Sequence, residues 1–151
     1  MIRYADAVND RDALVSGLHA FIEYINKPNL FPEAEKAERE QAFMNIIQSP
    51  AMCTIVDEVN GELVGFIGLA IVPYMWNPKH LVAEELFWWC VKDKATPTTA
   101  LKLIRAAHEH CKEHGVHILS MSMMYNSPKQ VAQVYNRTGL ELIQSTFAGV
   151  L

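Results

Sequence analysis

The chain has 151 residues, a length that fits one domain with a sizeable hydrophobic core. Hydrophobic residues make up 50% of it, which excludes a disordered chain, and its net charge of −4 argues against a nucleic-acid binder. Its three cysteines have no paired spacing, which favours free thiols in a reducing compartment. The first residues do not form a signal peptide, and no apolar run approaches the roughly 20 residues of a membrane span. We therefore expect a soluble cytoplasmic protein without a membrane partner, organised as a single domain over residues 1–151.

The N-terminal half of the chain predicts a short strand, two helices and a β-hairpin. Apolar residues at helical spacing mark the first helix, and proline with acidic residues marks the first turn of the second. The dipeptide Asn60-Gly61 is a strong signal for a tight hairpin turn, because both residues tolerate positive φ. The expected ranges are about 2–5 (strand), 10–26 and 32–49 (helices), and 51–58 and 62–72 (strands).

The C-terminal half predicts strands separated by helices. Gly115 and Gly139 are each placed to close a helix in a left-handed conformation. Helices between these strands imply parallel pairing, whereas the earlier hairpin implies antiparallel pairing, so the fold class is α/β with a mixed sheet. The expected ranges are 73–78 (loop), about 84–91 (strand), 97–114 (helix), 116–124 (strand), 128–138 (helix) and 140–151 (one or two short strands).

One segment of the second half begins with two adjacent carboxylates and leads through an apolar strand into a helix. In regular alternation Glu84 shares a face with Leu86, Trp88 and Cys90, and Glu85 points to the other face. A carboxylate at the end of an apolar strand would have a raised pKa, which suits a general base. The alternative is that both glutamates are solvated residues at a strand end. The start of the following helix could bind a phosphate through its free amides and its dipole.

The order of elements, together with the run Tyr135-Asn136-Arg137-Thr138-Gly139-Leu140, resembles the GNAT acetyltransferase superfamily. The resemblance spans most of the chain and is best from Asn60 to Gly139. It implies a central mixed sheet of six or seven strands flanked by about four helices, with acetyl-CoA as co-substrate. It also implies that the fourth strand splays from the fifth and that the pantetheine arm lies in the gap. Phe87-Trp88-Trp89 followed by Leu101-Lys102-Leu103-Ile104-Arg105-Ala106 is similar to short, phage-type members.

The resemblance also implies roles for individual residues. The catalytic candidates are Glu84 and Glu85, with Glu84 favoured as the base, and Tyr135 as the acid that protonates the departing thiolate. The alternative for Tyr135 is an aromatic core residue before a helix end. Asn126 could contact the pantetheine arm or simply occupy a turn. The candidate cofactor-binding residues are Cys90, Val91, Ala95, Thr96, Thr98, Thr99, Ala100, Leu101 and Asn126.

The phosphate-binding turn departs from the pattern of that superfamily. Ala95 stands where the superfamily has Arg or Gln, Thr98 stands in place of its first Gly, and Pro97 removes one backbone donor. Two outcomes follow from the sequence. The free amides and threonine hydroxyls of the turn could still hold a pyrophosphate, or Thr96 could cap its own helix and satisfy the turn from within.

The function that the resemblance implies is acetyl transfer from acetyl-CoA to a primary amine of a small molecule or a protein. The alternative is a catalytically inactive GNAT-fold binding protein. The similarity to phage-type members implies, for this alternative, a phage-encoded protein that acts on a host factor or serves within the virion. Tyr74 and Trp76 could form a lid at the acceptor entrance or cover the sheet, and with Phe147 they leave room for a homodimer. His110 and His114 have a metal-binding spacing, but without convergent further ligands we expect no metal site.

Overall fold

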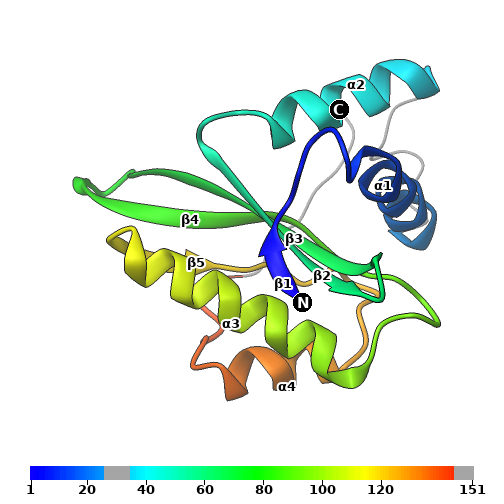
Figure 1. Ribbon diagram of the computed structural model, residues 1–151. Helices are drawn as coiled ribbons and strands as arrows, with labels where there is room; N and C mark the ends of the chain where they lie inside the picture. Colours follow the sequence, from blue (N-terminus) through cyan, green and yellow to red (C-terminus); the bar gives the residue numbers. More distant parts are fainter. Residues whose placement is uncertain (26–34, 145–151) are drawn as a thin grey trace, which may run out of the picture.

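A mixed β-sheet with helices on both faces forms the centre of the protein (Figure 1). The computed structural model describes residues 1–25 and 35–144. Helices α1 and α2 lie on one side of the sheet, and α3 and α4 lie on the other (Figure 1). The elements in chain order are β1 (Ile2–Tyr4), α1 (Arg11–Ile25), α2 (Lys36–Ile47), β2 (Met52–Val59), β3 (Glu62–Tyr74), β4 (Asn77–Cys90), α3 (Pro97–Glu113), β5 (Val116–Ser120) and α4 (Gln130–Arg137).

The strands lie side by side in the order β1-β2-β3-β4-β5. The first four pair antiparallel, and β5 pairs parallel to β4 after the crossover through α3. The mixed α/β prediction is therefore confirmed. The described part of the chain contains five strands, fewer than the six or seven expected.

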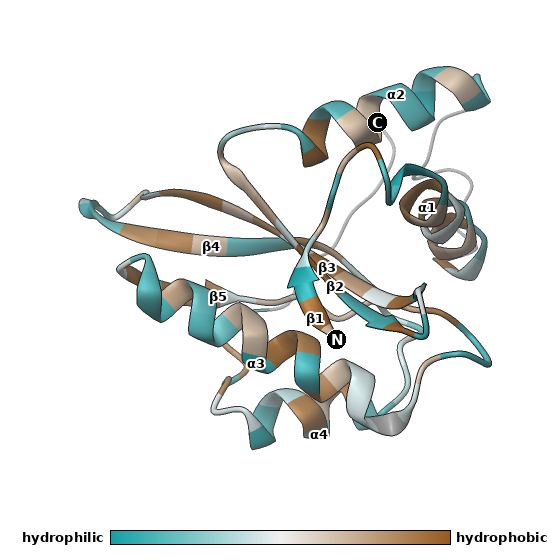
Figure 2. Ribbon diagram, viewed as in Figure 1, coloured by the Kyte–Doolittle hydropathy of each residue, from teal (hydrophilic) through white to brown (hydrophobic). Residues whose placement is uncertain are grey.

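Two apolar clusters hold the helices against the sheet. On one face Leu103 and Ala107 of α3 are fully buried against Ile67 and Leu69 of β3. On the other face Leu14 of α1 and residues of α2 pack on side chains of β2, β3 and β4. Figure 2 shows hydrophobic residues on the sheet and on the helices that cover it. Burial of apolar area from both faces is the main source of stability for this layered arrangement.

Local turn signals in the sequence match the backbone. Asn60 and Gly61 have φ of 53° and 81°, as a tight hairpin turn requires. Gly115 and Gly139 have φ of 67° and 83°, so both helices end with a left-handed glycine as predicted. The predicted helices over 10–26, 32–49, 97–114 and 128–138 are all present within a few residues at each end in the described part of the chain.

The expected loop over 73–78 is wrong. Strand β3 continues to Tyr74 and β4 begins at Asn77, so only Met75 and Trp76 form the turn. Pro73 is tolerated because the register shifts between Pro73 and Tyr74, and a strand irregularity accommodates a residue without an N–H.

The expected strand over 116–124 is shorter than predicted, because β5 ends at Ser120, where its pairing with β4 stops. Residues 140–144 form no strand. The remainder of the predicted C-terminal strands, including Phe147, lies outside the described residues.

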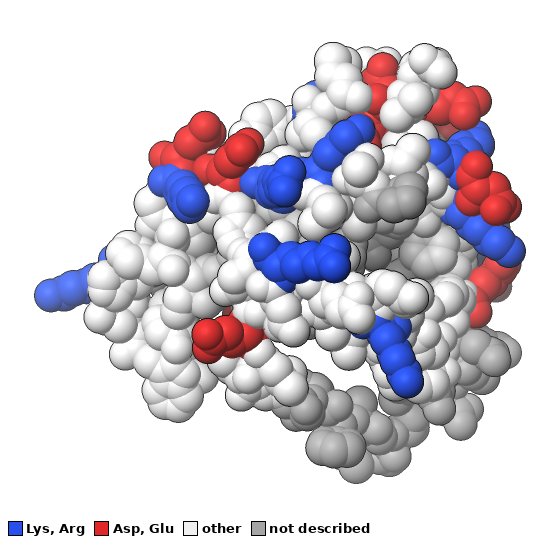
Figure 3. Space-filling model, turned by 90° about the horizontal axis from the view of Figure 1, so that it is seen from below, with Lys and Arg blue, Asp and Glu red and all other residues white. Residues whose placement is uncertain are grey.

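The surface on the side of α3 and α4 is largely neutral. Figure 3 shows its Lys and Arg side chains singly and in small groups, interspersed with acidic side chains. None of the described helices is long and apolar enough to cross a lipid bilayer.

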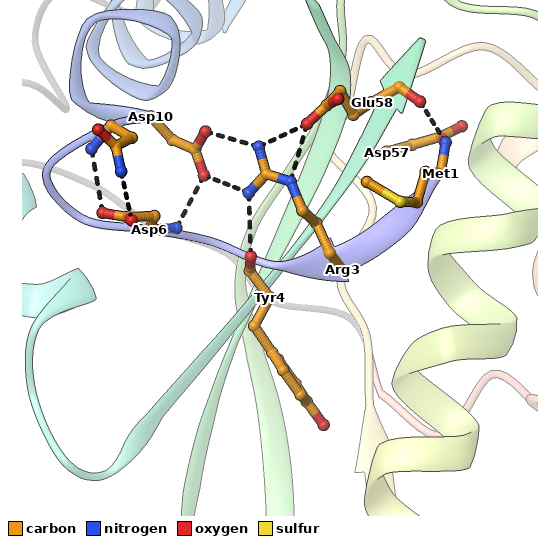
Figure 4. Close-up of polar contacts among 8 residues, drawn as sticks. Met1, Arg3, Tyr4, Asp6, Asp10, Asp57 and Glu58 are labelled. Carbon is orange, nitrogen blue, oxygen red and sulfur yellow. Dashed lines mark hydrogen bonds and ion pairs between the residues drawn. The ribbon is translucent and has the colours of Figure 1, made fainter. Parts of the chain in front are cut away.

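A charged network joins β1 and β2 to the start of α1 (Figure 4). Arg3 makes a bidentate contact with Asp10, at 2.7 and 2.8 Å, and its Nε donates to Glu58 Oε2 at 2.8 Å. Hydrogen bonds and charge from Arg3 lower the pKa of the Asp10 carboxyl, which is only 6% exposed. Asp10 also accepts a hydrogen bond from the Asp6 amide. The network therefore fixes the entry of the chain into α1.

Candidate active site

A β-bulge in β4 determines which glutamate enters the candidate site. In the register of β3 and β4, Leu69 lies opposite Glu85 and Gly68 lies opposite Phe87, which leaves Leu86 without a partner. The Phe87 ring packs over Gly68, where an added Cβ would lie 2.1 Å from a ring atom. One extra residue on β4 reverses the alternation of side chains on either side of it.

The bulge places Glu85 on the same face of the sheet as Trp88 and Cys90. Residues directly opposite in an antiparallel pair share a face, and Glu85 lies opposite Leu69 in the α3-side cluster. Glu84 lies opposite Ala70 on the other face and is exposed. The prediction that Glu84 shares a face with Trp88 and Cys90 is therefore wrong, and that position belongs to Glu85.

Glu85 and Tyr135 meet at the backbone of Ser122. The Ser122 amide donates to Glu85 Oε2 at 3.0 Å, and the Tyr135 hydroxyl donates to the Ser122 carbonyl at 2.6 Å. Burial raises the pKa of Glu85 to about 7. Burial, and then the nearby Glu85 charge, raise the pKa of the Tyr135 hydroxyl. The site thus pairs a carboxylate that titrates near neutrality with a phenol that keeps its proton.

Three separate parts of the chain build this site. Glu85 comes from β4, Ser122 from the segment after β5, and Tyr135 from α4. The Tyr135 ring also lies 5.7 Å from the Trp88 ring. Sequence reasoning did not find Ser122, because a residue that acts through its backbone leaves no side-chain signal.

Two buried polar atoms, one beside the site and one in the chain segment that follows Ser122, have no partner among the described residues. They are Nε1 of Trp88, a hydrogen-bond donor, and Oδ1 of Asn126, an acceptor. The other polar groups of Asn126 join the end of α1: its Nδ2 donates to the Tyr24 carbonyl at 2.7 Å, and its carbonyl accepts from the Tyr24 hydroxyl at 2.6 Å. Asn126 thus occupies a turn, which is one of the two alternatives from the sequence. Its Oδ1 still accepts no hydrogen bond from the described residues. An unused donor and an unused acceptor suit a ligand that carries amide groups, such as a pantetheine arm.

The turn before α3 satisfies much of its own hydrogen bonding. The amides of Lys94 and Ala95 donate to the Val91 carbonyl, at 3.2 and 2.9 Å. The Thr96 amide donates to Thr99 Oγ1 at 3.1 Å, and Thr99 is only 1% exposed. Thr96 and Thr99 therefore use hydrogen-bonding groups of the turn between themselves, which is the second of the two outcomes that the sequence allows.

The other residues proposed for the cofactor lie as follows. Thr98 is exposed, and its hydroxyl shares a hydrogen bond with Thr96 Oγ1 at 2.8 Å. The Val91 amide donates to the Val64 carbonyl of β3. Ala100 and Leu101 are partly buried in the first turns of α3. Burial raises the pKa of Cys90 to about 11, so its thiol stays protonated near neutral pH.

The histidine and hairpin candidates lie apart from this site. The rings of His110 and His114 stack at 4.0 Å, but no group of three or more His, Cys, Asp or Glu within residues 1–25 and 35–144 is arranged to hold a metal ion. Met75 and Trp76 are 76% and 78% exposed at the tip of the β3–β4 hairpin. The tip lies some nine residues before Glu85, roughly 30 Å along the strand. These side chains are therefore not a lid over Glu85.

The fold is shared with solved acetyltransferase structures, so the fold that the resemblance implies is confirmed. The structure is similar to a putative acetyltransferase from Agrobacterium tumefaciens str. C58, with a TM-score of 0.78, 17% identity, and coverage of 100% of this chain and 99% of that chain. It is also similar to a ribosomal-protein-alanine N-acetyltransferase from Brucella melitensis biovar Abortus 2308, with a TM-score of 0.74, 14% identity, and coverage of 100% and 99%.

A further similar structure is a predicted acetyltransferase with acetyl-CoA from Clostridium acetobutylicum. Its TM-score is 0.74 at 16% identity, over 99% of this chain and 95% of that chain. At these identities the likeness establishes the fold. No protein-family model matches the sequence. A sequence comparison with curated proteins likewise finds no match.

Proposed function

We propose that this protein is an N-acetyltransferase that moves an acetyl group from acetyl-CoA to a primary amine of a small molecule or a protein. The observation that carries the proposal is the meeting of Glu85 and Tyr135 at Ser122, at the point where β4 and β5 separate. Acetyl transfer to an amine needs a base for the amine and an acid for the leaving thiolate, and this pair supplies both.

Glu85 is the base in this proposal. With a pKa of about 7, a substantial fraction of its carboxyl is ionised at neutral pH. Its carboxylate takes a proton from the incoming ammonium, directly or through one water, and thereby frees the nitrogen lone pair. The Ser122 amide holds the carboxylate in place during this step.

Tyr135 is the acid. Its raised pKa keeps the proton on the hydroxyl, where it is available to the leaving sulfur. In the structure that proton points at the Ser122 carbonyl, so Tyr135 must exchange this hydrogen bond for one to the sulfur. The negative charge of Glu85 disfavours ionisation of Tyr135, and that effect ends when Glu85 receives the proton of the amine.

Acetyl-CoA supplies the activated thioester and the leaving thiolate. Residues that would hold it are Asn126, through its unused Oδ1, and the exposed hydroxyls of Thr96 and Thr98 at the start of α3. The acceptor class rests on the fold neighbours, which include the ribosomal-protein-alanine acetyltransferase and an aminoglycoside acetyltransferase from a soil metagenomic sample.

The test is thiol release from acetyl-CoA in the presence of a panel of amines, among them aminoglycosides, polyamines and peptides with free N-termini. Glu85→Gln and Tyr135→Phe should each lower kcat about 100-fold or more. Glu84→Gln is the matched control, because it removes a neighbouring carboxylate from the opposite face, and it should leave kcat within about twofold. Equal turnover by wild type and Glu85→Gln would refute the assigned base.

A second function is favoured by the turn before α3. Because Thr96 and Thr99 satisfy each other there, the turn offers a pyrophosphate fewer free amides than a glycine-rich turn would. This observation supports a catalytically inactive GNAT-fold binding protein, the alternative that the sequence also raised. Calorimetry with acetyl-CoA tests the first function, since absence of binding at high micromolar ligand would exclude the enzyme.

A further inference from the structure

The indole of Trp88 has a buried N–H group without a partner among the described residues. An indole nitrogen can only donate a hydrogen bond, so its partner must be an acceptor. A buried donor left unpaired costs free energy, and folded proteins rarely leave one in that state. Such an orphan at a candidate site indicates a ligand that satisfies it.

Trp88 lies at the part of the site where the acyl donor would be held. It follows Glu85 by three residues on β4, beyond the last pair between β4 and β5, which is Glu84 with Ser120. Its ring centroid is 5.7 Å from that of Tyr135, the proposed acid for the leaving sulfur. The groups of acetyl-CoA nearest the sulfur are carbonyls, namely the thioester and the first amide of the arm, and both accept hydrogen bonds.

We propose that the Trp88 indole N–H donates a hydrogen bond to a carbonyl oxygen of the acyl-pantetheine arm and so positions the arm beside Tyr135. The inference rests on the proposed function, because it requires that acetyl-CoA binds. It makes Trp88 a positioning residue, with no proton transferred at its nitrogen.

The first test is calorimetry with wild type and Trp88→Phe. Phenylalanine keeps an aromatic ring against Tyr135 and removes only the donor and part of the ring area. Loss of one neutral hydrogen bond should weaken acetyl-CoA binding about threefold to tenfold. A parallel titration with CoA, which lacks the thioester carbonyl, identifies the acceptor. Weakening of acetyl-CoA alone points to the thioester, and weakening of both ligands points to the amide.

The matched control is Trp76→Phe. It makes the same change of side chain at the tip of the β3–β4 hairpin, where Trp76 is 78% exposed. Its substitution should leave both affinities within about twofold. Equal affinity of Trp88→Phe and wild type for both ligands would overturn this inference alone. Absence of binding by wild type would overturn the proposed function and the inference together.

The second test measures the wild-type protein, so it does not depend on whether a variant folds. The chain has three tryptophans, so a ¹⁵N spectrum of labelled wild type shows three indole N–H signals. Acetyl-CoA should shift the Trp88 signal downfield as its hydrogen bond forms. The signal of Trp76, which is 78% exposed at the hairpin tip, should stay in place. A Trp88 signal that does not move at saturating acetyl-CoA would refute the proposal.

Discussion

Replacement of Glu85 by glutamine should stabilise the protein while it abolishes most of the proposed acetyltransferase activity. The substitution keeps the shape of the side chain and an oxygen that can accept from the Ser122 amide, but it removes the ionisable group. Burial raises the pKa of Glu85 from 4.5 to about 7 in the folded chain. The folded state therefore opposes ionisation of this carboxyl, and glutamine relieves that cost.

The pH dependence of this effect has a definite sign. Below pH 4.5 the carboxyl is protonated in both states, and the substitution has no electrostatic effect on stability. Between pH 4.5 and about 7 the unfolded chain releases its proton and the folded chain keeps it, so wild-type stability falls as pH rises. At 1.36 kcal/mol per pH unit, the full cost above pH 7 is about 3 kcal/mol.

Chemical denaturation of wild type and Glu85→Gln at pH 4.5, 6 and 8 measures this cost. The difference in free energy of unfolding should be near zero at pH 4.5 and reach about 3 kcal/mol in favour of the variant at pH 8. For a chain of this length that gain corresponds to a rise in Tm of roughly 6 to 12 °C. Glu84→Gln, at an exposed position one residue away, should show no such trend. A constant difference between Glu85→Gln and wild type across this pH range would refute the assigned environment of Glu85.

Three further substitutions test other parts of the structure. Gly68→Ala should cost about 1 to 3 kcal/mol of stability by forcing the Phe87 ring out of its packing, and an unchanged denaturation midpoint would contradict that packing. Arg3→Met should cost about 3 kcal/mol of stability at pH 7, because it leaves Asp10 charged and buried. Since Arg3 lowers the pKa of Asp10, this loss of stability should shrink as acid protonates the Asp10 carboxyl. A loss that does not depend on pH would argue against the pairing of Arg3 with Asp10. Cys90→Ala should retain at least half of wild-type kcat, since a thiol with a pKa of about 11 is no nucleophile near neutral pH; loss of all turnover in the thiol-release assay would reopen that role.

Features with short-range causes were predicted correctly. The Asn60-Gly61 turn depends on two residues that accept positive φ, and the closing glycines of α3 and α4 depend on the same property. Helix α3 begins at Pro97 with Thr96 as its N-cap, and these two residues favour a helix start by themselves. Such signals lie within a few residues of the structure that they form, so one sequence suffices to find them.

Features that depend on distant partners were missed. Pro73 and Pro78 predict a loop, but pairing between β3 and β4 extends the hairpin to Met75 and Trp76. The end of β5 at Ser120 is set by the point where its pairing with β4 stops. In both cases long-range pairing outweighed the local preference, because each added pair brings hydrogen bonds and side-chain contacts from another strand.

The sequence by itself determined the mixed α/β fold, the strand that carries two glutamates, and the tyrosine before a helix-closing glycine. It did not determine which glutamate faces that tyrosine, because side chains on a strand alternate with a period of two and one extra residue reverses the order. Only the pairing of β4 with β3 showed the bulge at Leu86. The tertiary structure then placed Glu85 at the N–H and Tyr135 at the C=O of the same residue, Ser122, because that contact joins residues from three separate parts of the chain.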